Sequence, residues 1–314
     1  MSDPASAMSM AIVSFNTRDL VAQCVTSALA AHPGQVIVVD NASQDATVEM
    51  LHAEFPGVTV IANDVNRGYG AAANQAVAAS CAPAVLLLNS DTVVAPDCVA
   101  TLAGYLAAHP SVAVVGPRLA NADGSLQRST YPFPSAADMV LGETGLHRLV
   151  RRIPGLRERF LRTWRHDVAR PVPWVLGAAL AIRRAPFELV GGFDESYFLY
   201  SEEVDLCRRL KTAGFETHYA PVTTVVHYGG ESTRQLGEGM RRQLIMSKAG
   251  YLRRHETRSK ARRVLLTLRI IAAGRLLRDV VRLRTSRDEC ERVGLRASVE
   301  ASKSLIAEHA LWRV

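Results

Sequence analysis

The sequence has few cysteines, no long apolar run and no recognisable leader. Its five cysteines form no Cys-x-x-Cys pair and no cysteine–histidine spacing typical of zinc. Neither a disulfide framework nor a zinc site is therefore expected, and a reducing compartment is the simpler interpretation. No apolar run approaches the ~20 residues that span a bilayer, and residues 1–10 lack the basic and apolar segments of a signal peptide. We expect a cytoplasmic protein that is soluble or peripheral to a membrane.

Acidic residues are unevenly distributed, and this asymmetry is more informative than the total charge. The net charge of +7 combines −8 over residues 1–147 with basic blocks of +6 over 148–170 and +13 over 234–287. Such blocks favour a polyanionic partner, which is a nucleic acid, a phosphate-rich ligand or an anionic membrane surface. Over 262–284, however, arginines and apolar residues alternate without a clear amphipathic face. A helix packed on the catalytic domain with its arginines in solvent is the alternative to membrane contact.

Short apolar, β-branched runs alternate with helical patterns, which is typical of an α/β protein with a mostly parallel sheet flanked by helices. The expected strands are Met10–Phe15, Val36–Asp40, Val58–Ala62, Val85–Asn89 and Val112–Gly116, and the expected helices are Leu20–Ala31, Thr47–Phe55, Gly70–Ser80 and Pro96–His109. Strand patterns resume at Val172–Arg183 and Val222–His227. After Arg234 the chain is predicted to be helical and basic.

Asp40 ends an otherwise apolar strand, at the sheet edge where ligands bind in open α/β folds. Its carboxylate can accept a hydrogen bond from a pyrimidine N–H or a ribose hydroxyl. Capping of the next helix by Asn41 or Ser43 is the alternative interpretation of this segment.

A glycine-containing turn follows the third expected strand. Gly68 and Gly70 allow the chain to enter a helix whose N-terminal amides can face a phosphate, and Arg67 adds positive charge. The Gly-x-Gly-x-x-Ala pattern does not follow the first strand, and no strand-ending acid lies about 20 residues further on. The dinucleotide-binding fingerprint is therefore not met. This argues against a NAD-dependent dehydrogenase, which is one of two alternative functions considered for the sequence.

Asp91 and His227 are the candidate metal ligands. Asp91 closes the segment Leu-Leu-Leu-Asn-Ser-Asp at the end of a buried strand, and His227 ends the last expected strand. A divalent cation bound together with a diphosphate needs only one or two carboxylates, and a neutral histidine can complete its shell. An aspartate in a turn or helix cap and a structural histidine are the alternatives.

Glu202, Glu203 and Asp205 form the densest group of acids. If a helix begins near Ser201, Glu202 and Asp205 are neighbours on one face and Glu203 lies on another. Such clustering raises at least one pKa, which suits a general base. A serine-capped helix with acids in its first turn is the alternative, and the two interpretations are compatible.

Taken in order, these segments resemble the inverting family 2 glycosyltransferases with the GT-A fold, and among them the rhamnosyltransferase-type members of bacterial cell-wall and polysaccharide assembly. The match covers about Met10 to Ser232. The resemblance implies a catalytic domain over 1–233, with a nucleotide-binding half at 8–120 and an acceptor half at 121–233. A helical basic region over 234–314 follows.

The resemblance also implies roles for individual residues. Asp91 is the implied metal ligand, with His227 near the diphosphate. The family's base is the second acid of its Glu-Asp-x-Asp-Leu-Cys-x-Arg motif, so Glu203 inherits that role. Because many members have Asp at this position, the choice between Glu202 and Glu203 stays open, and Asp205 is the third catalytic candidate. The residues implied to bind the nucleotide and the donor sugar are Ser14, Asn16, Asp40, Asn41, Asn66, Arg67, Gly68, Asn74, Asn89, Gly177 and Ala178.

Cofactor and partners follow from the same resemblance. It implies Mg²⁺ or Mn²⁺, a nucleotide-diphospho-sugar donor that is dTDP-L-rhamnose or a UDP-sugar, and a saccharide acceptor carried on a polyprenyl diphosphate. Transfer would be a single in-line displacement with inversion. We expect an anionic membrane surface as a partner and no nucleic acid, because the sequence has no recognised nucleic-acid-binding motif. A non-catalytic nucleic-acid binder is the second alternative function, and the sequence leaves a homo-oligomer open.

Overall fold

The computed structural model describes residues 7–135, 139, 144, 164–229 and 239–307, in two compact units. The first unit comprises the described part of Met1–Phe133 and Trp164–Gln235, and the second that of Pro134–Thr163 and Leu236–Val314. Most of the basic stretch 148–170 and the residues after Gly229 in the predicted His-x-x-Gly-x-Ser segment lie outside the described residues. The domain boundaries predicted from the sequence stay predictions.

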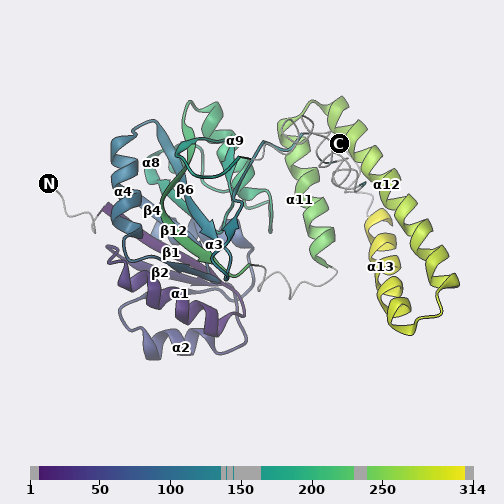
Figure 1. Ribbon diagram of the computed structural model, residues 1–314, viewed down its shortest axis with the longest axis horizontal. Coiled ribbons are helices and arrows are strands. Elements are labelled where there is room, and N and C mark those ends of the chain that lie inside the picture. Colours follow the sequence, from purple (N-terminus) through teal and green to yellow (C-terminus); the bar gives the residue numbers. More distant parts are fainter. Residues whose placement is uncertain (1–6, 136–138, 140–143, 145–163, 230–238, 308–314) are drawn as a thin grey trace. The chain divides into compact units, whose positions relative to one another are not determined.

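The first unit is built on a mixed sheet (Figure 1). Among the described residues its main path runs β3-β2-β1-β4-β11-β6-β12-β5. The strands on this path are β1 (Met8–Ser14), β2 (Val36–Asp40), β3 (Thr59–Ala62), β4 (Ala84–Asn89), β5 (Thr92–Val94), β6 (Val112–Ala120), β11 (Ala179–Arg183) and β12 (Glu216–His227). The first four strands in this order are parallel, β11 is antiparallel to both of its neighbours, and β12 is parallel to β6.

Short strands complete the unit. Strand β7 (Leu126–Gln127) pairs with β6, β9 (Arg170–Pro171) pairs with β12, and β8 (Thr130–Tyr131) pairs with β10 (Trp174–Val175). The predicted strand over Val172–Arg183 is thus two strands, β10 and β11, with the Gly177 segment between them.

Two hydrophobic clusters hold helices on opposite faces of this sheet, because side chains alternate along a strand. In β1, Met10 and Ile12 belong to the cluster that contains α1 (Arg18–Ala30), α2 (Thr47–Glu54) and α4 (Cys98–Ala108). Ala11 belongs to the cluster that contains α3 (Tyr69–Ala79), α8 (Arg184–Leu189) and α9 (Glu202–Thr212). The predicted strands and helices of residues 10–116 are found within two residues of their expected ends, except that β6 runs four residues further.

The register of the parallel strands places the polar strand ends in one row. Ser14 is paired with Asp40 of β2, and Val13 beside it is paired with Asn89 of β4. Since parallel strands end at the same edge of a sheet, the segments that follow β1, β2 and β4 leave from one edge. The site described below is built along this edge.

The second unit contains the helices α11 (Gly239–His255), α12 (Arg258–Thr285) and α13 (Glu289–Ala307). Helix α12 packs along α13 (Figure 1), and Asp279 of α12 is buried and accepts a hydrogen bond of 2.8 Å from Ser298 of α13. Within the described part of the chain, no helix combines the length and the hydropathy of a membrane span.

Candidate functional site

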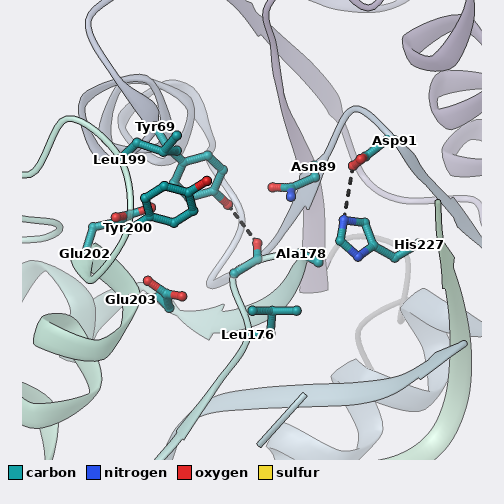
Figure 2. Close-up of a pocket in the computed structure, with 11 residues that line it drawn as sticks. Tyr69, Asn89, Asp91, Leu176, Ala178, Leu199, Tyr200, Glu202, Glu203 and His227 are labelled. Atoms are coloured by element: carbon teal, nitrogen blue, oxygen red, sulfur yellow. Dashed lines mark hydrogen bonds and ion pairs between the residues drawn. The ribbon is translucent and has the colours of Figure 1, made fainter. Parts of the chain in front are cut away.

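A cavity of about 210 Å³ opens in the first unit, at the carboxyl end of β4 and the N-terminus of α9. Figure 2 shows the Asp91–His227 pair on one side of it and the two glutamates on the other. The lining residues are Tyr69, Asn89, Asp91, Leu176, Gly177, Ala178, Leu199, Tyr200, Glu202, Glu203 and His227. Seven of the residues predicted from the sequence thus meet in one cavity, although they lie up to 138 positions apart in the chain.

Asp91 and His227 are brought together by backbone pairing. His227, the last residue of β12, is in register with Thr92 of β5, and Tyr228 donates its N–H to the Asp91 carbonyl over 3.0 Å. Their side chains are both largely buried, and His227 Nε2 lies 3.3 Å from Asp91 Oδ1. The edge strand β5 therefore positions the aspartate beside the histidine.

Gln127 determines how His227 faces this pair. Gln127 Oε1 lies 2.7 Å from His227 Nδ1, while Gln127 Nε2 donates to Asn121 Oδ1 over 3.0 Å and to the His227 carbonyl over 3.4 Å. Because the amide nitrogen has these acceptors, the amide oxygen is the atom that faces the ring, and Nδ1 must carry the proton. In the neutral ring the Nε2 atom then turns a lone pair towards Asp91.

This arrangement fits a divalent cation. Among the described residues His227 Nε2 is buried without a hydrogen-bond partner and lies beside a carboxylate oxygen of Asp91. When the ring is neutral, two electron-rich atoms therefore face each other. Two ligand bonds of about 2.1 Å at a right angle end about 3 Å apart, close to the 3.3 Å seen here. The described residues contain no cluster of three or more His, Cys, Asp or Glu side chains able to hold a metal. A cation at Asp91 and His227 would thus need oxygens from a diphosphate or from water.

Replacing Gln127 by leucine should weaken Mn²⁺ binding about 10- to 100-fold, because His227 loses the acceptor that orients its ring. Gln127→Glu keeps an acceptor oxygen and should stay closer to wild type. Mn²⁺ titration in the presence of UDP, followed by electron paramagnetic resonance, measures the affinity. Long-range ¹H–¹⁵N spectra of the metal-free protein report which ring nitrogen carries the proton. Unchanged Mn²⁺ affinity in Gln127→Leu would contradict the positioning role.

Glu202 and Glu203 begin α9 and are both buried at the cavity. The chain reaches them through Tyr200 and Ser201, whose φ angles of 69° and 73° lie in the left-handed region that non-glycine residues rarely adopt. One carboxylate oxygen of each glutamate is buried without a hydrogen-bond partner among the described residues. The strained entry thus delivers two incompletely satisfied carboxyl groups to one cavity.

The two glutamates have different acidities. Burial and the adjacent Glu203 carboxylate raise the pKa of Glu202 well above its usual range. Burial also raises the pKa of Glu203, but backbone N–H groups, including that of Gly177, counteract it and the pKa is about 7. The charge of Glu203 acts on Glu202, so Glu203 is the first of the two to ionise and is the carboxylate able to accept a proton.

Of the three acids predicted at the start of this helix, Glu202 and Glu203 line the cavity and Asp205 does not. Asp205 is fully buried outside the cavity lining and binds Arg209 over 2.7 Å. Arg209 in turn donates to the carbonyls of Val190 and Gly192, both over 2.7 Å. Asp205 thus holds the loop that precedes α9.

A reaction in which Glu203 acts as the base should speed up as pH rises, with a midpoint near 7, because this buried carboxyl has a pKa of about 7 and accepts a proton only when ionised. The acid form predominates below the midpoint and the base form above it, so the low-pH limb is the one that this group controls. The dependence of kcat/KM on pH, measured at saturating cation, tests this. A rate that is flat between about pH 6 and pH 8 would contradict it.

The residues predicted to bind the nucleotide form a polar network beside the cavity. Asp40 is buried and accepts hydrogen bonds from the Ser43 N–H over 2.8 Å and from its hydroxyl over 2.5 Å, and burial raises the pKa of Asp40. The Ser43 hydroxyl oxygen accepts from the N–H of Asn16 over 2.8 Å. Ala46, not Asn41 or Ser43, occupies the N-cap position of α2. Asp40 thus organises the loop between β2 and α2.

Ser14 connects this network to the Asp91 segment. Its hydroxyl lies 3.3 Å from that of Thr17, which donates to the Ser90 hydroxyl over 2.7 Å. Asn89, by contrast, reaches the cavity itself. Of the implied nucleotide and sugar ligands, those that line the cavity are Asn89, Gly177 and Ala178.

Asn66, Gly68 and Asn41 build the turn before α3. Asn66 Oδ1 accepts the Gly68 N–H over 2.9 Å, and Asn41 Nδ2 donates to the Gly68 carbonyl over 3.1 Å. Gly68 has a φ of +82°, and a Cβ atom there would lie 2.3 Å from the Phe198 carbonyl oxygen. The loop before α9 therefore rests directly on this glycine.

Arg67 and Asn74 also contact the loop before α9. Asn74 accepts the Phe193 N–H and donates to the Phe193 carbonyl, each over 2.9 Å. Arg67 lies 3.9 Å from Glu195, and both side chains are about half exposed. In the described structure these residues join the two halves of the unit rather than line the cavity.

Gly68→Ala should lower the free energy of unfolding by about 2 kcal/mol or more, because the new Cβ combines a left-handed φ with a backbone clash. The matched control is Gly124→Ala, since Gly124 has a similar φ of +79° but nothing within 4 Å of its Cβ position. Urea unfolding of both variants separates the clash from the cost of φ alone. Equal destabilisation of the two would show that the contact with Phe198 is unimportant.

Some cavity residues were not predicted from the sequence. Tyr69 donates its hydroxyl to the Gly177 carbonyl over 3.1 Å, and burial and the two glutamates raise its pKa. Leu176, Leu199 and Tyr200 also line the cavity. Each lies within three positions of a predicted residue, which is the signal that could have found them. Gln127 offers no such signal.

Comparison with known proteins identifies the family. The family model described as "Glycosyl transferase family 2" matches residues 9–167, half of the chain. The chain belongs to glycosyl transferase family 2. It is 32% identical over 216 residues to an N-acetylglucosaminyl-diphospho-decaprenol L-rhamnosyltransferase of Mycobacterium tuberculosis, over 64% of this chain and 68% of that protein. It is 37% identical over 83 residues to the rhamnosyltransferase WbbL of Escherichia coli, over 26% of this chain and 31% of that protein.

The fold agrees with this assignment. A mannosyltransferase from Pyrobaculum calidifontis, solved in complex with GDP-Man and Mn²⁺, superimposes with a TM-score of 0.56 at 16% identity, over 96% of this chain and 87% of that one. The predicted GT-A fold is confirmed, and the protein is a glycosyltransferase with rhamnosyltransferase relatives in polysaccharide biosynthesis. Neither alternative function, dehydrogenase or nucleic-acid binder, agrees with membership of this family.

Proposed function

We propose that this family 2 glycosyltransferase moves a sugar from a nucleoside diphosphate onto a hydroxyl of a saccharide linked to a polyprenyl diphosphate, with inversion, in bacterial cell-wall or polysaccharide assembly. The observation that carries the proposal is the meeting of the Asp91–His227 pair and Glu203 in one cavity. A charge-stabilising element and a base are the two groups that such a transfer requires.

Asp91 and His227 would hold Mg²⁺ or Mn²⁺ together with the donor diphosphate. The bound cation supplies positive charge to the departing nucleoside diphosphate. Glu203 takes the proton from the acceptor hydroxyl, on the side of the sugar opposite the diphosphate, which is the geometry of a single displacement with inversion. The raised pKa of Glu202 favours its neutral form beside Glu203, which limits the negative charge in the cavity.

The remaining residues position the substrates. Asp40, with Ser14 and Asn16, is proposed to recognise the base and ribose at the row of strand ends. Asn89, Gly177 and Ala178 line the cavity where the sugar would lie. The donor is proposed to be dTDP-L-rhamnose, with a UDP-sugar as the second candidate; support comes from relatives that are named rhamnosyltransferases.

Membrane contact is part of the proposal. A polyprenyl-linked acceptor resides in a bilayer, so we place the enzyme peripherally at the cytoplasmic face, with the basic region after residue 234 towards anionic lipid.

The test is a donor screen. Purified protein is incubated with dTDP-L-rhamnose, UDP-glucose, UDP-galactose or GDP-mannose, a short-chain polyprenyl diphosphate carrying N-acetylglucosamine, and Mg²⁺ or Mn²⁺. Mass spectrometry of the lipid and the anomeric NMR signal of the product give the sugar and its configuration. We expect rhamnosylation from dTDP-L-rhamnose with inversion. Turnover with a UDP-sugar alone would replace the donor, and a retained configuration would overturn the displacement mechanism.

A further inference from the structure

Helix α12 is apolar on two opposite faces. One face is buried within the second unit by Ala261, Val264, Leu265, Leu268 and Ala272. On the other side, four large apolar residues are more than half exposed: Leu266, Ile270, Leu277 and Val281. A helix turns by about 100° per residue, so these four lie within a sector of about 60° and along about 22 Å of the axis. We call them the exposed stripe.

Two apolar faces explain why the sequence shows no clear amphipathic pattern over 262–284. Apolar residues on opposite sides of a helix cancel each other's contribution to its amphipathicity. Only the packing against the rest of the unit reveals which side is left uncovered. The exposed stripe is therefore a feature of the structure that periodicity alone could not display.

Basic residues accompany the stripe. Arg262 and Arg263 lie at its two borders near the start of α12, Arg284 continues its line at the end, and all three are exposed. Residues 258–285 hold nine basic residues and one acid. That acid, Asp279, is buried and bonded to Arg278 over 2.7 Å. Lys260 pairs with Glu256, Arg278 with Asp279 and Arg282 with Glu291. The remaining basic residues leave the surface around the stripe positive.

This charge identifies the occupant of the stripe. A second copy packed on the stripe would place arginines against arginines, which is unfavourable. Anionic lipid headgroups complement the arginines, and the acyl boundary beneath them accepts the apolar side chains. Since no described helix can span a bilayer, the fitting orientation is parallel to the membrane surface.

We propose that α12 lies in the interface of an anionic membrane, with Leu266, Ile270, Leu277 and Val281 inserted below the headgroups and Arg262, Arg263 and Arg284 among the lipid phosphates. This inference rests on the membrane contact of the proposed function and names the protein surface that makes it. Its test measures binding without sugar transfer, so that each of the two can fail independently.

The experiment is co-sedimentation of the full chain with vesicles of phosphatidylcholine containing one quarter phosphatidylglycerol, and with pure phosphatidylcholine. Leu266→Ser/Leu277→Ser should lower the partition coefficient on anionic vesicles at least tenfold. Arg262→Gln/Arg263→Gln should lower it about fivefold for each arginine. The matched control is Leu189→Ser/Val293→Ser, which removes two exposed apolar side chains elsewhere and should bind like wild type.

A direct readout covers the case in which the double variants fold poorly. Ile270→Trp adds a tryptophan to the stripe. Lipids brominated near the glycerol end of the acyl chain should quench a larger fraction of the tryptophan fluorescence in this variant than in wild type. Vesicle binding unchanged in Leu266→Ser/Leu277→Ser, or no added quenching, would overturn the proposal. So would a dimer, seen by light scattering, that disappears only in the stripe variant, because the occupant would then be a second copy.

Discussion

Glu203→Gln should lower kcat about 10²- to 10⁴-fold, the usual contribution of a positioned general base. Glutamine has the same shape but cannot take the acceptor proton at any pH. KM for the donor should change little, because the cation ligands Asp91 and His227 are untouched. Steady-state kinetics with the donor identified in the screen, measured at about pH 7.5, gives both values.

The same variant has a signature that separates a lost base from a damaged fold. Ionisation of a buried acid with a raised pKa destabilises the native state, so wild-type stability is full below pH 4.5 and falls as pH rises through about 7. Glu203→Gln removes this loss. Its free energy of unfolding should exceed that of wild type by on the order of 3 kcal/mol at pH 8 and should equal it near pH 4. Thermal melts of both proteins at the two pH values measure this difference in stability.

Two controls complete the design. Glu188→Gln alters an exposed glutamate of α8 and should leave kcat unchanged. Glu202→Gln replaces a carboxyl whose raised pKa favours its neutral form, and it should retain much more activity than Glu203→Gln. If Glu203→Gln kept near-normal turnover while Glu202→Gln was inactive, the base would be Glu202.

Asp91→Ala should lower kcat about 10²- to 10³-fold or more and abolish measurable Mn²⁺ binding in the presence of UDP. The carboxylate is the charged member of the pair with His227, and the described residues place no third acidic or imidazole ligand beside them. A neutral histidine alone holds a hard cation weakly. Calorimetric titration of Mn²⁺ and the rate at saturating cation test the two effects separately.

The matched control is Asp19→Ala, which removes an exposed aspartate of α1. It should bind Mn²⁺ and turn over like wild type. Removing free cation with EDTA should reproduce the Asp91→Ala rate in the wild-type protein. Full activity in EDTA would show that transfer does not depend on a cation, and would remove Asp91 and His227 from the metal role.

Much of the fold could be predicted because local pattern and tertiary structure agree in the first half of the chain. The apolar strands β1, β2 and β4 are buried on both faces and read as continuous runs, and the helices between them repeat with helical spacing. The insertion of β11 antiparallel between β4 and β6 could not be predicted, since no local signal records which strands pair at long range.

The cavity could be predicted in part for a related reason. Asp91, Glu203 and His227 stand where strands end or a helix begins, and such positions are visible in sequence. Two details of this site have no signal in the sequence. Glu203 lies at the cavity with Glu202 while Asp205 does not, and the chain enters α9 through a left-handed backbone at Tyr200 and Ser201.

Other parts depend on contacts between distant segments. Gln127 is hydrogen-bonded to His227, which lies 100 positions away in the sequence. Asn74 is hydrogen-bonded to Phe193, which lies 119 positions away. The sequence around an isolated polar residue does not indicate which distant residue it will contact. The same holds for α12, whose uncovered side is known only once its covered side has been packed.

The attachment of the Phe193–Phe198 segment to the Gly68 turn has a mechanical consequence. The Tyr69 N–H donates to the Phe198 carbonyl over 3.0 Å, and Asn74 holds Phe193 by both of its backbone polar groups. A nucleotide that shifts this turn must carry the entry to α9 with it, and Glu203 moves with that entry. The Gly68 turn and the entry to α9 therefore cannot move independently of each other.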